Sequence, residues 1–409
     1  MPFIRFLQDR QGSVVPTFAL SAVAVFGFVG AALDYSRGNS TKAAIQAALD
    51  ATGLILSHEA EKIEDSAALK QKATDYFKAQ FTRPEAKNVQ VDATLTSPQK
   101  GSFILNVAAS ATVDTTIARV IGQTEMKVAS TTEIRWGIKK LELALVLDNT
   151  WSMNSSNKIQ SLRTASHNLL NKLETAVKDP GDIKVAIVPF DTMVNVGTAF
   201  KDEFWINYGV KSIQKDQWTG CVIDRDQSND VGDTAPVSGS SSTYFPAQNC
   251  PSLASAMQLS SDWTALHAKV DQMVAVPVNQ NTGSGYTNVT IGLVWGWHAL
   301  TQNLPFNTAA APNPSELDKV IVLLTDGENT RNRWTTSSSS IDSRTATTCV
   351  NAKAANIKIY TVRVIDGDAS LLKTCATKTN MYYDVAQADM LNNAFSSIAQ
   401  DLTKLRIAK

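Results

Sequence analysis

The sequence predicts an α/β protein whose main domain is a doubly wound, mostly parallel sheet, preceded by an N-terminal transmembrane helix and a small α+β module. From about residue 139, strands that are apolar at nearly every position alternate with helical stretches, which is typical of strands buried on both faces of a parallel sheet. Residues 13–33 contain no charged residue. Residues 87–136 show the alternating pattern of half-buried strands.

The composition is that of a globular protein with balanced charge. The 409 residues are enough for two or three domains. Lys plus Arg and Asp plus Glu both number 38, so the net charge is zero. Nucleic-acid binders usually show a basic excess or stripe, and we therefore expect no nucleic-acid partner.

The first element is the apolar segment 13–33. Its 21 residues would form a helix of about 31 Å, enough to cross a bilayer core. Arg5 and Arg10 precede it, so the positive-inside rule places the tail, residues 1–12, in the cytoplasm and everything after Asp34 outside it. A retained anchor is the interpretation we prefer, and a cleaved signal peptide is the alternative. Both export the bulk of the chain.

The four cysteines could be buried thiols or two local disulfides. None lies in a C-x-x-C pair, which gives little support to a zinc or redox site. Export favours the pairs Cys221–Cys250 and Cys349–Cys375. Each bridge would close a loop of about 27–30 residues, worth about 3–4 kcal/mol in the chain-entropy model.

Residues 34–138 are predicted to form a helical stalk and a small α+β module. A small-residue packing face on the stalk helix comprises Ala44, Ala47, Ala48, Ala51, Leu54 and Ile55. A second helix is expected near 64–82. Strands are expected at 89–97, 102–113 and 126–136, with a hairpin turn over 97–102.

Residues 139–409 are predicted to form the doubly wound domain. The expected strands are 141–148, 183–190, 319–326 and 357–364, and the expected helices lie near 157–178, 262–275, 288–302, 343–355 and 387–405. Residues 192–200 follow their strand too closely for a helical crossover and should pair antiparallel at an edge. Residues 201–282 are polar and interrupt the alternation of strands and helices. We therefore interpret them as an insertion that is cross-linked by a Cys221–Cys250 disulfide.

Oxygen-bearing side chains stand where the predicted strands end. Asp148, Thr150 and Ser152 follow the first strand at alternate positions, Asp326 ends a later strand, and Thr287 precedes a helix. Ligands of open α/β sheets bind outside the carboxyl ends of the strands, so these five side chains should converge. Two carboxylates and three hydroxyls suit a hard divalent cation, with Mg²⁺ preferred and Ca²⁺ or Mn²⁺ possible.

Other interpretations of these motifs need no metal. An Asx-turn with Ser152 as a helix N-cap would explain the first motif alone. Residues 224–230 carry acids at alternate positions but lack the Gly and Glu of a calcium loop, which favours a solvated polar loop.

The sequence offers no catalytic constellation, and we expect a protein that is not an enzyme. It contains no G-x-S-x-G elbow, Walker loop or G-x-G-x-x-G motif. Its histidines are scattered, and His298 lies in an apolar helical stretch, where a packed core residue is expected rather than a general base.

The stretches "LVLDNTWSM", "GYTNVTIGLVWGWHAL" and "VIVLLTDGEN" resemble the three parts of the metal-ion-dependent adhesion site (MIDAS) of von Willebrand factor type A domains, which are Rossmann-like. The resemblance implies that Thr150 and Ser152 bind the ion directly or through water, together with Thr287. It implies that Asp148 and Asp326 act mainly through water or hydrogen bonds.

The same resemblance implies an open coordination position, which an Asp or Glu carboxylate of a protein partner fills. Thr150 stands where the family more often has Ser, which keeps the hydroxyl. Trp151 stands where the bacterial branch usually has Gly, so a bulky ring should lie beside the ion.

The N-terminal stretch from Phe6 to Leu54 is similar to the pilus-assembly segment of TadE/TadG-like proteins of the tight-adherence (Tad/Flp) system. The C-terminal stretch, including its cysteine pair, resembles the TadG branch. These likenesses imply a single-pass protein of the bacterial cell envelope, periplasmic or at the cell surface, with pilus or pilus-machine proteins as partners. Two functions follow as hypotheses: a metal-dependent binding module, or a structural pilus-machine subunit whose metal site only stabilises its fold.

Overall fold

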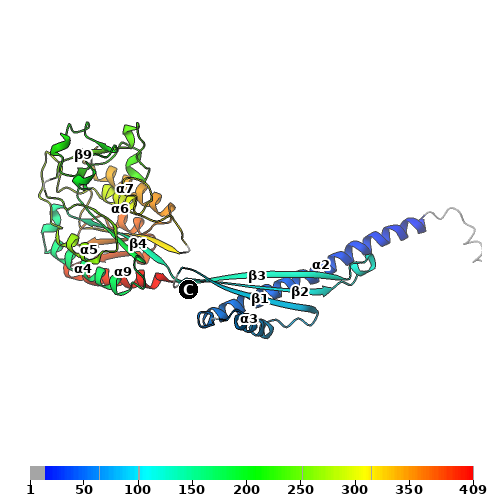
Figure 1. Ribbon diagram of the computed structural model, residues 1–409. Helices are drawn as coiled ribbons and strands as arrows, with labels where there is room; N and C mark the ends of the chain where they lie inside the picture. The colour runs from blue at the N-terminus through cyan, green and yellow to red at the C-terminus, as the bar shows by residue number, and fades with distance from the viewer. Residues whose placement is uncertain (1–13, 64, 100–101, 251, 315, 409) are drawn as a thin grey trace, which may run out of the picture. The chain divides into compact units, whose positions relative to one another are not determined.

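The computed structural model describes residues 14–63, 65–99, 102–250, 252–314 and 316–408. These residues divide into two compact units, an N-terminal unit that ends at Gly137 and an α/β unit that begins at Ile138 (Figure 1). The predicted cytoplasmic tail, with Arg5 and Arg10, and the first residue of the predicted span, Ser13, lie outside the described residues.

The N-terminal unit begins with one long helix, α2 (Val14–Ser57), of 44 residues. Part of it is long and apolar enough to cross a membrane, with a mean hydropathy of 2.0 over the best window. Its apolar side chains are exposed there; Phe18 and Phe28, for example, are 73% and 79% exposed. The predicted span and stalk are therefore one continuous helix.

The rest of the N-terminal unit is a helix and an antiparallel sheet. These elements are α3 (Ser66–Gln80), β1 (Ala86–Gln99), β2 (Ser102–Asp114) and β3 (Glu125–Ile138). Asp65 caps α3 by accepting hydrogen bonds from the backbone N–H groups of Ala67 and Ala68. Strand β2 is central and pairs antiparallel with both β1 and β3.

The buried face of α2 differs from the predicted one. Of the predicted residues only Ala48 is buried, whereas Leu54 and Ile55 are exposed. A Cβ at Gly53 would lie 2.8 Å from a side-chain carbon of Ile134, so the sheet approaches the helix where a side chain is missing. An alanine-rich helix has several apolar stripes that could be buried. Which stripe is buried depends on how closely the sheet can pack against it. The selected stripe includes Thr41, Ile45, Ala48, Leu49, Thr52, Gly53 and Leu56.

The α/β unit is built on one sheet with the order β13-β12-β11-β4-β5-β6-β8-β9-β7, and β10 pairs with β5. Neighbours from β13 to β5 are parallel, which confirms the predicted doubly wound, mostly parallel sheet. The central strands are β4 (Lys140–Asp148), β5 (Ile183–Phe190), β11 (Leu317–Thr325), β12 (Lys358–Val364) and β13 (Tyr382–Val385).

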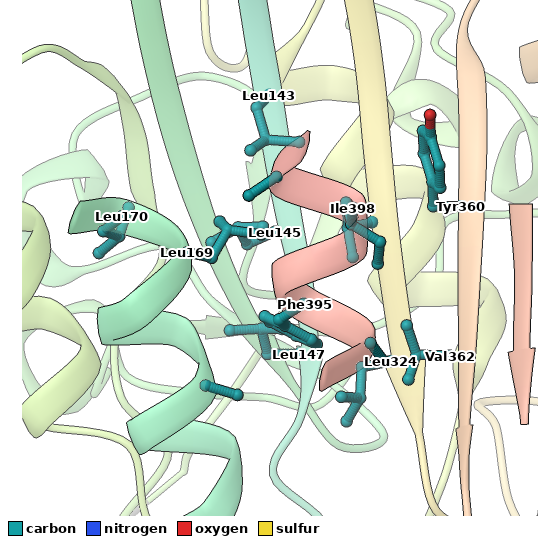
Figure 2. Close-up of a cluster of buried hydrophobic side chains, with 14 of the residues drawn as sticks. Leu143, Leu145, Leu147, Leu169, Leu170, Leu324, Tyr360, Val362, Phe395 and Ile398 are labelled. Carbon is teal, nitrogen blue, oxygen red and sulfur yellow. The ribbon is translucent and has the colours of Figure 1, made fainter. Parts of the chain in front are cut away.

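Helices cover both faces of this sheet. One face packs on α4 (Lys158–Thr175), α5 (Trp263–Asp271) and α9 (Leu391–Arg406), and the other on α6 (Val289–Ala299), α7 (Ser338–Ala354) and α8 (Ala369–Cys375). The two-residue strand β14 (Ile407–Ala408) follows α9. Side chains of β4 alternate between the faces: Leu145 and Leu147 pack in the cluster of Phe395 (Figure 2), whereas Val146 packs in the opposite one.

Several details of the predicted α/β unit were wrong or missed. Residues 192–200 do pair antiparallel with β5 through β6 (Val194–Asn195), but β6 is not an edge strand, because β8 pairs with its other side. The polar segment 201–282 extends the sheet with β7 (Ile206–Asn207), β8 (Cys221–Val222), β9 (Phe245–Gln248) and β10 (Met257–Ser260). Strand β13 and helix α8 were not predicted.

Both predicted disulfides are formed. Cys221 bonds Cys250 with a Cα–Cα distance of 5.8 Å. Cys349 on α7 bonds Cys375 at the end of α8, with a Cα–Cα distance of 5.1 Å. The second bridge ties together two helices on the same face of the sheet.

Removing the second disulfide should destabilise the α/β unit. For the double variant Cys349→Ser/Cys375→Ser we expect the free energy of unfolding to fall by about 2–5 kcal/mol. Guanidinium unfolding followed by tryptophan fluorescence measures this, because all but one of the tryptophans belong to this unit. Thr347→Ser, an exposed change on α7, should shift stability by less than about 0.5 kcal/mol. Unreduced native protein that alkylates at four thiols would contradict the bridges themselves.

Candidate metal centre

The candidate site lies where the sheet changes its direction of winding. Strands β4 and β11 are parallel neighbours, with Leu147 paired to Leu324, so their carboxyl ends lie side by side. The chain leaves β4 toward β5 on one side and later returns to β11 on the other. Asp148 is the last residue of β4, and Asp326 directly follows Thr325, the last of β11. This is the switch point at which open α/β sheets bind ligands.

Asp148 is fully buried and joins the two strands. Its Oδ1 accepts a hydrogen bond from the backbone N–H of Thr150 at 2.8 Å, and its Oδ2 accepts one from the Thr325 hydroxyl at 2.6 Å. Both carboxylate oxygens are therefore engaged with the protein. This arrangement agrees with an indirect role, through hydrogen bonds, at the site.

A short 3-10 turn, Trp151–Asn154, brings the two hydroxyls of the first motif together. The Oγ1 of Thr150 lies 2.9 Å from the Oγ of Ser152, and the Ser152 hydroxyl donates to Oδ1 of Asp326 at 2.6 Å. The Asx-turn of the metal-free interpretation is present, but Ser152 is not a helix N-cap. That position belongs to Thr150 for the turn and to Asn157 for α4.

Thr287 reaches the same place from the loop before α6. A Cβ built on Gly327 would lie 3.3 Å from Oγ1 of Thr287 and 3.7 Å from Oγ of Ser152. Both hydroxyls therefore border the space that the absent side chain of Gly327 leaves open. The structure thus brings together all five residues that the sequence singled out.

The two carboxylates of the site lack full compensation for their burial. Burial, and then the negative charge of Asp326, raise the pKa of Asp148 to about 7. Lys158, the first residue of α4, is only 3% exposed, and its Nζ lies 2.8 Å from Oδ2 of Asp326 and 3.5 Å from Oδ2 of Asp366. Sequence reasoning missed Lys158; a lysine ten residues after Asp148 carries no motif signal of its own.

The chemistry of these residues fits a hard divalent cation. Hydroxyl oxygens border the Gly327 space, and the Asp326 carboxylate is hydrogen-bonded to one of them. Hydroxyl and carboxylate oxygens are the ligands that Mg²⁺, Mn²⁺ and Ca²⁺ prefer. Among the residues that the structure describes, no group of three or more His, Cys, Asp or Glu side chains could hold a metal. A site here would therefore depend on Thr150, Ser152 and Thr287 for neutral ligands, with Asp148 and Asp326 supplying charge.

Buried polar contacts fix the loops that carry the hydroxyls. Asp191, at the end of β5, accepts hydrogen bonds from the N–H groups of Gly285 and Met193, each at 2.8 Å. Asn329 accepts one from the N–H of Val289 at 2.7 Å, which satisfies a donor at the start of α6. The segment that carries Thr287 is thus held on both sides by buried polar groups.

Residues 224–230 are not the solvated loop that we predicted. Asp224 is 4% exposed, and its carboxylate accepts both hydrogen bonds from the amide of Asn288, at 2.9 and 3.0 Å. Asp230 is equally buried and pairs with Arg344 on α7. These acids therefore bind side chains of distant segments rather than water. Through Asp224, the segment fixes Asn288, the residue next to Thr287.

Exposed aromatic rings lie on two of the segments that carry site residues. Ser152 is exposed, and Trp151 next to it is 46% exposed. Trp334, on the segment after Asp326, is 45% exposed, and the guanidinium of Arg333 lies 4.1 Å from its ring centroid. Exposed tryptophans and arginines are the residues that most often dominate protein interfaces.

Comparison with known protein families identifies the N-terminal segment. Residues 12–55 match the family model of putative Flp pilus-assembly TadE/G-like proteins. The match covers the apolar helix and the start of the stalk, so the Tad-type resemblance is confirmed for this segment. The family match and the apolar helix together fit a membrane-anchored envelope protein. No match was found among curated proteins.

Solved structures similar to this chain include proteins of pili and of the mussel byssus. The pilus adhesin SpaC from Lactobacillus rhamnosus GG is 15% identical with a TM-score of 0.40, over 80% of this chain and 36% of its own. The vWF domain of the type V pili tip protein Mfa5 from Porphyromonas gingivalis is 13% identical with a TM-score of 0.41, over 66% and 97%. Proximal thread matrix protein 1 from the mussel byssus, with a zinc-occupied MIDAS motif, is 13% identical with a TM-score of 0.37, over 65% and 48%. The chain thus spans little more than a third of SpaC.

Lys158 should be needed for stability. In Lys158→Met the Asp326 carboxylate would lose its closest buried counter-charge, so we expect the free energy of unfolding to fall by about 3–5 kcal/mol in the presence of EDTA. Lys172→Met on the same helix, which has no acidic partner within ion-pair distance among the described residues, should cost less than about 0.5 kcal/mol. Equal stabilities of the two variants in denaturant titrations would contradict the role given to the Lys158 ion pair.

Proposed function

We propose that this protein is a membrane-anchored, extracytoplasmic binding protein that grips a protein partner through a divalent cation, in tight-adherence pilus assembly or surface adhesion. One observation carries the proposal. Thr150, Ser152 and Thr287 bring their hydroxyls to the carboxylates of Asp148 and Asp326 at the switch point of the sheet.

Charge supports a site that binds a cation and then an anion. A bound cation favours the ionised form of Asp148. With both carboxylates ionised, Asp148 and Asp326 contribute −2 and Lys158 contributes +1, so these three side chains carry −1 (−2 + 1). A divalent cation would change this to +1 (−1 + 2). An Asp or Glu carboxylate of the partner would then be attracted to the loaded site. Mg²⁺ is the cation that we propose, with Ca²⁺ and Mn²⁺ as the alternatives.

Access supports a macromolecular partner rather than a small substrate. The deeper donors are buried, whereas Ser152 and Trp151 are exposed, so an incoming carboxylate would pass the tryptophan ring to reach the cation. An exposed ring beside an anion site suits a protein surface that offers one acidic side chain amid apolar contacts. We therefore propose binding, and no enzymatic activity.

Lys158 favours a second candidate function. Its ammonium already balances Asp326, so the loops hold part of their charge compensation without any metal. In that case the protein would be a structural subunit of the pilus machine, and a cation would only add stability. The Flp pilus-assembly segment at residues 12–55 is compatible with both candidates, and pilus or pilus-machine proteins are the proposed partners in each.

Ser152→Ala should weaken cation binding without harming the fold. Ser152 is exposed, whereas Asp148 is buried between two strands, so the serine variant separates binding from stability more cleanly. Calorimetric titration of the full chain with Mg²⁺, Ca²⁺ and Mn²⁺ should show an affinity at least about tenfold lower for the variant. The control is Ser155→Ala, whose hydroxyl donates to the backbone carbonyl of Ser152 and not into the site.

The same variants separate the two functions. Purified protein is incubated with envelope extract in Mg²⁺ or in EDTA, and bound proteins are compared. The binding-module function requires a partner that is retained in Mg²⁺, released by EDTA and lost in Ser152→Ala. A variant that loses the cation yet retains the partner would exclude that function and leave the structural one.

The bulk of the chain should be exported. The apolar part of α2 follows Arg5 and Arg10, and this asymmetry keeps the short end in the cytoplasm. Protease added to spheroplasts should therefore degrade the chain beyond Asp34, while a cytoplasmic marker protein survives. Complete protection of the chain until detergent is added would reverse the proposed topology.

A further inference from the structure

The connection between β2 and β3 bends back onto α2 within the N-terminal unit (Figure 1). We call residues 115–122 the β2–β3 tip. The Asp34 carboxylate on α2 accepts hydrogen bonds from three successive backbone N–H groups of this tip, those of Thr116 (2.8 Å), Ile117 (2.9 Å) and Ala118 (2.8 Å). Arg37 adds a hydrogen bond to the Thr116 hydroxyl at 2.7 Å. The tip is therefore fixed to one level of the helix.

That level lies inside the apolar segment. A Cβ at Gly30 would lie 2.2 Å from Cγ2 of Ile117, so the isoleucine rests directly on the helix backbone at a position where no other residue would fit. Gly30 belongs to the apolar segment 13–33, about 4–5 Å of helix before its end. If this segment spans the bilayer, Ile117 is at the depth of the membrane boundary.

The tip presents apolar and basic side chains to its surroundings. Val120 is 84% exposed and Ile117 is 38% exposed. Arg37 and Arg119 are exposed at the same end of the unit. Apolar side chains flanked by arginines are the combination that enters a lipid interface, with the guanidinium groups at the phosphates.

We propose that the β2–β3 tip is a second membrane contact, in which Ile117 and Val120 enter the outer-facing leaflet of the membrane that α2 crosses. Arg37 and Arg119 bind lipid phosphates beside them. The inference rests on the membrane anchor of the proposed function. A single helix can rotate about its axis and tilt in a bilayer, and a lipid contact held at Asp34 would restrict both motions and orient the N-terminal unit on the membrane surface.

Depth-dependent fluorescence quenching tests this contact in the full chain. All four native cysteines are in disulfides, so a single introduced cysteine can be labelled with the fluorophore NBD. The label is placed at Val120→Cys in the tip, at Val23→Cys in the apolar segment, and at Ala68→Cys, an exposed position on α3. Each protein is reconstituted in phosphatidylethanolamine–phosphatidylglycerol vesicles with and without lipids that carry a nitroxide on the acyl chain.

The expected result is a blue-shifted emission and strong quenching at positions 120 and 23, with neither at position 68. Quenching at 23 but not at 120 would overturn the tip contact and leave the anchor intact. A blue shift at 120 without lipid quenching would show that protein, such as the helix of a second copy, covers the tip, and would also overturn it. Absence of quenching at 23 would refute the anchor itself, and the tip contact with it.

Discussion

A buried carboxylate that bridges two neighbouring strands is the constraint on which the candidate site depends. Asp148 accepts from the backbone after β4 and from the last side chain of β11. Those two contacts set the start of the Trp151–Asn154 turn against the end of β11. Ser152 can then reach Asp326 across 174 residues of sequence. Without this side chain, the backbone after β4 and the Thr325 hydroxyl would both lose their shared partner.

Burial makes this arrangement dependent on positive charge. Two carboxylates close together in a region of low dielectric repel each other and lose their hydration. Lys158 supplies one compensating charge from within the chain, and the hydroxyls around Gly327 offer a place for another. The loops thus fold with partial compensation, and a cation added later would complete it. Under the proposed function, such a site would respond to cation concentration without unfolding.

The N-terminal unit meets a different constraint, because its one long helix carries both an uncovered apolar segment and a face that packs on a sheet. Glycines and threonines on one stripe of α2 let the sheet approach the backbone closely, as Gly53 does against Ile134. Before Asp34 the remaining faces are apolar and uncovered, whereas beyond it they carry exposed charged residues such as Arg37, Lys42 and Asp50. Asp34 directly follows the uncovered apolar segment, and its carboxylate accepts hydrogen bonds from three backbone N–H groups. Those hydrogen bonds, first from Ala118 and then from Thr116, lower the pKa of Asp34 and keep it charged.

Local pattern determined the parts of this protein that depend on neighbouring residues. Strands β1 to β5, β11 and β12 and most helices follow from the pattern of apolar residues. Both disulfides follow from export and short cysteine spacing, and the five candidate site residues follow from polar groups at strand ends. Tertiary structure decided what depends on distant segments. Lys158 acquires its role only when β11 brings Asp326 to the start of α4. Asp224 can be buried because Asn288 and the backbone of Arg333, 64 and 109 residues away, donate hydrogen bonds to its carboxylate. Several stripes of α2 are apolar enough to be buried. The stripe that is buried contains Gly53, where the sheet packs directly on the helix backbone.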